Sequence, residues 1–303
     1  MWFKNLTVYR LPADWNWSAA SIEEALARRP LQPCSAFEMQ STGWVPPATT
    51  DRLLHTLGEH HLLALGVNQK LLPASVVRQE AEQRARIQAQ TQGFPVGRRQ
   101  MRALKMQVLE ELRARALSRR RLTRAWIDPR GGWLVVDSAS DRRAEELVDT
   151  LRDTLGSLAV QKVDTQRSPS VCMAAWLMQS GAVGAFSVEQ DLELQSGEPA
   201  KSIVRYRRHP LDGKEVRAYV AGGKRPTQLG LTWNGRISFV LTEKLQIKRI
   251  EFLEVAQERA DEEEIDPAEQ FDLDFAVMAG ELAKLLVELI RELDGKAEDR
   301  AAA

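Results

Sequence analysis

The chain of 303 residues has few cysteines and histidines and no long apolar run. Cys34 and Cys172 lack the CxxC spacing of a zinc site, and isolated thiols in a reducing compartment are typically core residues rather than a disulfide. The adjacent His60 and His61 would point in divergent directions, so no metal site is predicted. No window approaches ~18 uninterrupted apolar residues, and MWFKNLTVYRL lacks the pattern of a secretory signal. We therefore expect a cytoplasmic protein with no cofactor and no membrane contact.

The chain also lacks net charge, but the balance hides two opposite poles. The 42 Lys and Arg residues cancel the 42 Asp and Glu residues over the whole chain. Between residues 98 and 124, ten Lys and Arg residues accompany two Glu, a local charge of +8, whereas residues 251–274 carry eleven acidic residues and one Arg, a local charge of −10. A charged partner interacts with the local charge of a surface rather than with the net charge of the whole chain. The zero net charge therefore does not exclude nucleic acid.

Patterns that would indicate a common catalytic site are missing or incomplete. The segment AGGKRPT at 221–227 lacks the first glycine of a P-loop and the Ser or Thr that should follow its lysine. The segment GAVG at 181–184 has no preceding strand, as a dinucleotide fingerprint requires. The acidic run at 261–264 with Asp266 could gather a divalent cation, but it is more typical of a solvated loop that complements the start of the next helix. The sequence favours a protein that is not an enzyme, and a metal-dependent nuclease is the alternative.

Hydrophobic periodicity in the first half predicts an α+β arrangement that contains a helical hairpin. The predicted elements are a strand at 2–11, a helix capped by Ser21 that stops before Pro30, a loop at 41–51, a buried strand at 61–73, and helices at 74–87 and about 98–116. On the second hairpin helix, Met101, Leu104, Val108 and Leu112 recur at helical spacing and define one apolar stripe. The hairpin can therefore bury one side and present cations on another.

The second half predicts a helix, then a sheet-rich region, then a long apolar helix. The predicted elements are two strands around a turn at 128–132, helices at 141–158 and 171–180, strands at 201–208, 216–223, 227–242 and 245–254, and a helix that starts at Pro267. Asn234 and Gly235 predict a type I′ hairpin turn within 227–242. Asp266 and Glu269 have the spacing of a capping box for the last helix, which we expect to pack within the chain rather than form a coiled coil.

Two groups of basic residues are the candidate contacts to nucleic acid. Solvated helix faces usually place an acidic residue four positions from a basic one, whereas most basic residues between 98 and 124 have no acidic partner at that spacing. The first group contains Arg98, Arg99, Arg102, Lys105, Arg113, Arg115, Arg119, Arg120, Arg121 and Arg124, and the second contains Lys201, Arg205, Arg207, Arg208 and His209. No helix-turn-helix, zinc-finger or aromatic RNA-binding motif is present, so we predict phosphate contacts without sequence preference. An acidic protein partner that docks on the same groups is the alternative.

Several segments in a fixed order resemble the RdgC family of recombination-associated proteins over essentially the whole chain. They are MWFKNLTVYRL, CSAFEMQSTGWVPP, LLPASVVRQ, RAWIDPRGGWLVVDSAS and FDLDFAVMAGELAKLLVELI. The resemblance implies a ring-shaped homodimer that encircles double-stranded DNA without sequence preference, associates with the nucleoid and restrains homologous recombination by limiting RecA access. It also implies a central α+β domain at 1–75 and 123–165, an inserted helical tip at 76–122, a sheet-rich base domain at 166–265, and a C-terminal helix at 266–303 on the core.

The resemblance also assigns individual positions. The hydrophobic residue that closes the dimer gate in the family, usually a phenylalanine before Ser-Arg, falls on Leu117, which has no ring. The basic pair of the base domain falls on Arg208 and His209, where His209 replaces an uncharged polar residue. The basic residues of the tip fall on Arg98, Arg99, Arg102 and Lys105, with Arg115 just before the gate. The family carries over no catalytic residue.

Overall fold

The computed structural model describes residues 2–48, 50–179, 183–197, 201–253 and 266–293. These residues form a mixed α+β fold around one large sheet, in which every pair of neighbouring strands is antiparallel. The strands are β1 (Asn5–Arg10), β2 (Gln40–Val45), β3 (Leu54–Leu57), β4 (His60–Lys70), β5 (Ser118–Asp128), β6 (Trp133–Asp137), β7 (Gln161–Lys162), β8 (Phe186–Gln195), β9 (Ile203–Tyr206), β10 (Arg225–Trp233), β11 (Ile237–Thr242) and β12 (Ile247–Phe252). The helices are α1 (Ala19–Ala27), α2 (Ala74–Gln92), α3 (Arg98–Arg115), α4 (Asp141–Leu155), α5 (Pro169–Met178), α6 (Lys214–Ala221) and α8 (Pro267–Glu292).

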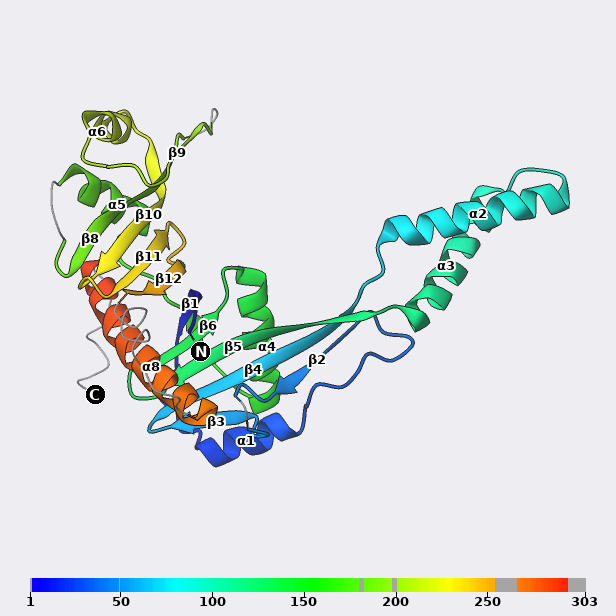
Figure 1. The fold of residues 1–303 in the computed structure, drawn as a ribbon, viewed down its shortest axis with the longest axis horizontal. Coiled ribbons are helices and arrows are strands. Elements are labelled where there is room, and N and C mark those ends of the chain that lie inside the picture. Colours follow the sequence, from blue (N-terminus) through cyan, green and yellow to red (C-terminus); the bar gives the residue numbers. More distant parts are fainter. Residues whose placement is uncertain (1, 49, 180–182, 198–200, 254–265, 294–303) are drawn as a thin grey trace.

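The sheet is continuous along the molecule, in the order β2-β4-β5-β6-β1-β12-β11-β10-β8-β9. β3 pairs with β4, and β7 pairs with β1. The pairing of β1 with β12, which joins Leu6 to Ile247, connects the two halves of the sheet. The chain forms an open arc, with β9 and α6 at one end and α2 and α3 projecting at the other (Figure 1). None of the helices in the described ranges is long and apolar enough to cross a membrane.

Helices cover both faces of the sheet where β4, β5 and β6 lie. On one face, α1 and α4 pack through Ile22 and Leu147 against Ile127 of β5. On the other face, Trp126 of β5 belongs to the core that α5 and α8 complete. Successive residues of a strand point to opposite faces, so a strand buried on both sides reads as a continuous apolar run. This explains the unbroken segment LLAL in β4, where both alternating sets of side chains are buried.

The last helix is confirmed as an intramolecular core element. In α8, Phe275, Met278, Leu282 and Leu285 are fully buried in the larger core. Pro267 occupies the first turn as predicted, because its missing N–H would have no partner there in any case. The predicted capping box does not form, since the side chain of the N-cap residue Asp266 accepts no hydrogen bond from the helix.

Other periodic segments also have the predicted structure. The helix α4 buries Leu147, Leu151 and Leu155 on one side, and α3 ends at Arg115, as its pattern indicates. β10 and β11 form the predicted hairpin, in which Asn234 and Gly235 both have positive φ, at 49° and 70°. Cys172 is buried, Cys34 is partly buried, and the two are not joined by a disulfide.

Three further expectations about elements were wrong, and the strands β3, β7 and β8 were missed. Residues 216–223, expected as a strand, belong largely to α6, because burial of Val216 and packing of the helix beside α5 outweigh the strand propensity of Val and Tyr. The loop at 41–51 begins within β2, which pairs with β4. The cap of α1 is Ser18, whose Oγ accepts a hydrogen bond from the Ser21 backbone N–H. β8 was missed, since its alternating acidic residues hide a strand that is paired on both sides.

Candidate nucleic-acid interface

The helical hairpin of α2 and α3 holds six cations of the first basic group, of which Arg113 and Arg115 lie in the last turn of α3. Its core is small and consists of Val77, Ala81 and Val108, with partly buried apolar side chains around them. The other four cations are exposed in the first turns of α3 and are Arg98, Arg99, Arg102 and Lys105. Across the described part of the chain, none of these four side chains forms an ion pair or a hydrogen bond within the protein.

The position of these cations is unfavourable for the helix itself. The N-terminus of a helix carries a partial positive charge that favours acidic side chains and disfavours basic ones. α3 has no acidic residue in its first turn, yet it begins with Arg98 and Arg99. In contrast, Arg84 on α2 is compensated by Glu80 at 2.9 Å and by Glu111 at 2.8 Å. An anionic partner would therefore stabilise the hairpin most at the start of α3, where the positive charge is uncompensated.

The arginines of β5 do not form one surface, because they lie on a strand and alternate between its faces. Arg119 and Arg121 point to the face that α4 covers, together with Ile127, whereas Arg120 and Arg124 point to the face of Trp126. The sequence run of arginines therefore divides across the sheet.

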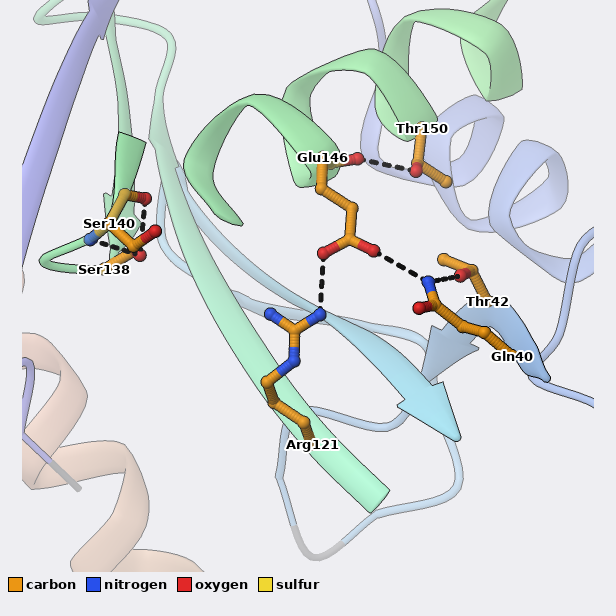
Figure 2. Close-up of polar contacts among 7 residues, drawn as sticks. All are labelled: Gln40, Thr42, Arg121, Ser138, Ser140, Glu146 and Thr150. Carbon is orange, nitrogen blue, oxygen red and sulfur yellow. Dashed lines mark hydrogen bonds and ion pairs between the residues drawn. The ribbon is translucent and has the colours of Figure 1, made fainter. Parts of the chain in front are cut away.

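Three of these arginines have partners within the chain. Arg120 Nε donates to Asn68 Oδ1 at 3.2 Å, and Arg124 Nε donates to the Pro47 carbonyl at 3.4 Å. Arg121 forms an ion pair with Glu146 of α4 at 2.7 Å. Figure 2 shows the Glu146 carboxylate between Arg121 and Gln40, whose side-chain amide donates to it at 3.1 Å. Arg119 is exposed and unpaired within the described ranges.

Leu117 lies in an exposed apolar patch where α3 returns to the sheet. The side chain of Leu117 is 79% exposed, and its carbonyl accepts the Leu71 backbone N–H at 2.8 Å. Phe37, which is 82% exposed, lies in the loop before β2. Lys70 holds this loop through the carbonyls of Ser35 and Met39, while Arg113 Nε donates to the Ala36 carbonyl at 3.2 Å. We refer to the exposed residues Phe37, Leu71 and Leu117 as the apolar patch. The sequence did not indicate Phe37, because the hydrogen bonds that hold its loop to Lys70 and Arg113 join distant parts of the chain.

The second basic group lies on β9 and on the residues just before and after it, where Glu193 of β8 partly neutralises it. The side chains of Lys201, Arg205, Arg207, Arg208 and His209 are all exposed. Arg205 Nε lies 2.6 Å from Glu193 Oε2, and the backbone N–H of Arg208, at a φ of 50°, donates to Asp191. Burial opposes the charge on Glu193, but hydrogen bonds from Arg205 and Thr227 outweigh it and hold the pKa of this carboxyl below its usual range. The group therefore carries less free positive charge than its sequence indicates.

His209 has a defined local geometry. Its Nδ1 lies 2.8 Å from the Pro210 carbonyl, which can only accept, so Nδ1 carries a proton. Its ring lies beside Tyr206, with the centroids 5.4 Å apart. The orientation leaves Nε2 as the ring atom that is available to a ligand.

The two basic groups lie at opposite ends of the arc. Figure 1 shows β9 at one end and α3 at the other, with the central strands between them. A polyanion that contacts both groups would have to span the open side of the arc.

The residues of the nuclease alternative lie mostly outside the described part of the chain. The run 261–264 is not described, and Asp266 is exposed at the start of α8. Within the described ranges, no group of three or more His, Cys, Asp or Glu side chains is placed to hold a metal ion. His60 and His61 lie on β4, where His60 Nδ1 accepts from Trp126 Nε1 and His61 Nδ1 faces Thr56 Oγ1, so the adjacent rings diverge as expected.

Comparison with known proteins finds relatives along nearly the whole chain. Residues 1–296 match the model of a family described as "Putative exonuclease, RdgC". The chain is 44% identical over 299 residues to the recombination-associated protein RdgC of Dechloromonas aromatica, with 98% of each chain covered. It is 46% identical over 296 residues to the protein of the same name from Cupriavidus pinatubonensis, with 98% of this chain and 99% of that one covered.

Proposed function

The chain belongs to the RdgC family of recombination-associated proteins, and we propose that it binds double-stranded DNA without sequence preference. The observation that carries the proposal is the row of uncompensated cations at the start of α3, namely Arg98, Arg99, Arg102 and Lys105. Their charge opposes the helix dipole, so it costs folding stability and is explained by a ligand rather than by the fold. Lysine and arginine side chains bind phosphates irrespective of the base sequence.

We propose that two copies of the arc close into a ring around the duplex. In this arrangement the tip (76–122) and the base (166–265) flank the central α+β domain (1–75 and 123–165), and the C-terminal helix (266–303) packs on the core. The apolar patch with Leu117 would form the gate between the two tips. A ring on the duplex would limit RecA access at the nucleoid and so restrain homologous recombination.

A DNA-binding titration across salt concentrations tests the first part of the proposal. If ~6 to 10 phosphates are neutralised, affinity should fall by ~10³ to 10⁵ between about 50 and 200 mM salt. The variant with Arg98, Arg99, Arg102 and Lys105 changed to alanine should bind more weakly. Its salt slope, the decrease of log K per unit of log salt concentration, should be smaller by roughly three to four. A matched control changes four cations in surface ion pairs, which are Arg28, Arg152, Lys162 and Lys284. Equal affinity of the tip variant and this control would contradict the assignment.

Nuclease activity is the competing function, and the description of the family model favours testing it directly. End-labelled duplex incubated with Mg²⁺ should stay intact if the proposal is correct. Cleavage that is abolished by Glu262→Gln with Glu263→Gln would overturn the non-enzymatic proposal. An adaptor that docks an acidic protein would instead show weak DNA affinity at physiological salt.

A further inference from the structure

A pocket on the α4 face of the sheet gathers arginines from two distant parts of the chain. It has a volume of about 420 Å³, and its lining includes Arg119 and Arg121 from β5, and Arg142 and Arg143 from the first turn of α4. The side chains of Arg119, Arg142 and Arg143 are exposed and form no ion pair or hydrogen bond within the described part of the chain. Arginine stays protonated at any accessible pH, so these charges repel one another without relief.

The acidic residues near the pocket are already engaged. Glu146 is the carboxylate in its lining, and it is paired with Arg121 at 2.7 Å. Asp141, which also lies in the first turn of α4, accepts from Lys162 Nζ at 2.6 Å and from Gln246 Nε2 at 2.8 Å, and it does not line the pocket. The hydrogen bond from Lys162 holds the pKa of Asp141 below its usual range, which keeps that negative charge beside Lys162. The pocket therefore keeps three arginines without a counter-ion.

The ion pair with Glu146 positions Arg121 and leaves other N–H donors of its guanidinium available to a ligand. The pair uses one terminal nitrogen of the guanidinium, which has five N–H donors in total. Glu146 is itself held by Gln40, so Arg121 keeps a fixed orientation at the wall of the pocket (Figure 2). The planar fork of arginine matches two oxygens of a phosphate at once, which an ammonium group cannot do.

We propose that this arginine pocket binds a phosphate group. Arg142 and Arg143, which belong to neither of the predicted basic groups, would bind the phosphate together with Arg119 and Arg121. The source of the phosphate is either the DNA backbone, in which case the inference rests on the proposed function, or a free phosphate ion. Because Arg119 and Arg121 lie on the opposite face of β5 from Arg120 and Arg124, the pocket is separate from the cations on that other face.

Two measurements on Arg142→Ala with Arg143→Ala test the proposal. The first is the midpoint of thermal unfolding in inorganic phosphate and in chloride at equal ionic strength, since a ligand that binds the folded state raises it. The second is the salt slope of affinity for a short DNA duplex. The control is Arg28→Ala with Lys284→Ala, which removes the same charge from two surface ion pairs. We expect phosphate to stabilise the wild type and the control but not the pocket variant.

The two measurements together also identify the source of the phosphate. A loss of about one from the salt slope in the pocket variant indicates a backbone phosphate of DNA, whereas an unchanged slope with lost phosphate stabilisation indicates the free ion. If the pocket variant keeps both the phosphate stabilisation and the slope, the proposal is overturned. A wild type that binds no DNA, yet is stabilised by phosphate through Arg142 and Arg143, would contradict the proposed function and support the pocket.

Two further variants separate recognition from folding damage. Arg142→Lys with Arg143→Lys keeps the charge but loses the planar fork, so it should retain only part of the phosphate stabilisation. Glu146→Gln removes a negative charge from the lining but keeps a side-chain oxygen that can accept from Arg121, so Arg121 should stay in place and phosphate binding should strengthen roughly 2- to 5-fold. Weaker phosphate binding by Glu146→Gln would contradict the assignment of the pocket as an anion site.

Discussion

At the residue scale, one step along β5 decides which partner an arginine can reach. Arg120 donates to Asn68, while Arg121, the next residue, pairs with Glu146 on the other face. The same alternation leaves Arg119 exposed near the arginines of α4. A run of adjacent arginines on a strand therefore supplies two separate surfaces, each with half of the charge.

Leu117 and Phe37 show a second effect of single positions. The resemblance to the RdgC family implies a phenylalanine where this chain has Leu117, so a gate at this position would lack the expected ring. Phe37 is 82% exposed in the loop that Lys70 and Arg113 hold beside the same end of the sheet. If the tips meet as proposed, Phe37 is placed to supply the aromatic contact.

His61 should make stability depend on pH. Burial lowers the pKa of His61 in the folded chain, and the charge of His60 lowers it further. In the unfolded chain this pKa is about 6.5. The unfolded state then binds the proton more tightly, so this contribution to stability is complete above that pH and is lost as the pH falls below it. We expect urea unfolding of the wild type to show falling stability from about pH 6.5 to pH 5, and His61→Gln to reduce the slope.

The matched control for this prediction is His209→Gln, because His209 is exposed on the loop after β9. This variant should keep the wild-type dependence. An unchanged slope in His61→Gln would show that other groups cause the loss of stability at low pH.

At the scale of elements, the α2 and α3 hairpin has a much smaller hydrophobic core than the two cores of the sheet. The buried residues of its core cluster are small and few, namely Val77, Ala81 and Val108. α8, in contrast, buries a continuous stripe of large side chains in the main core. The hairpin should therefore open locally at a lower free energy than the sheet.

Val108→Ala should loosen the hairpin while the sheet stays folded. Val108 is fully buried, and removal of two methyl groups costs roughly 2 kcal/mol, counting the cavity. We expect faster amide hydrogen exchange across α2 and α3, with little change in β4 and β6. Val76→Ala is the control, because Val76 lies on α2 with 45% of its surface exposed. Equally faster exchange in the central strands would show that the hairpin and the sheet unfold together.

At the scale of the whole molecule, the arc determines which contacts one chain can make. The cations of α3 and those after β9 lie at its two ends, and the continuous sheet separates them (Figure 1). Neither end has the charge that the sequence totals indicate, since the first group is divided between α3 and β5 and Glu193 offsets Arg205 in the second group. A duplex gripped by both ends would have to lie along the open side of the arc.

A closed ring would make dissociation depend on DNA ends. After binding at low salt and a challenge at high salt, the wild type should leave covalently closed circular DNA more slowly than the same DNA after linearisation, because no end is available for exit. Leu117→Asp with Phe37→Ser should weaken an apolar gate and abolish the difference, with Leu273→Asp as the control at another exposed leucine. Equal dissociation of the wild type from circular and linear DNA would contradict the ring.

The sequence by itself determined the features that depend on neighbours along the chain. The helical spacing of apolar residues located α3, α4 and α8, and Asn234-Gly235 located the hairpin of β10 and β11. Local charge counting found the cations at the start of α3. These signals are strong because helices and tight turns form through contacts between residues a few positions apart.

Only the tertiary structure decided which distant residues meet. It placed the acidic residues of β8 beside the basic residues of β9, turned part of a predicted strand into α6, and brought Phe37 to the end of the sheet where Leu117 lies. It also assembled the arginine pocket from Arg119 and Arg121 on β5 and from Arg142 and Arg143 on α4. Strand pairing and packing join segments that are far apart in the chain, so no local pattern contains this information.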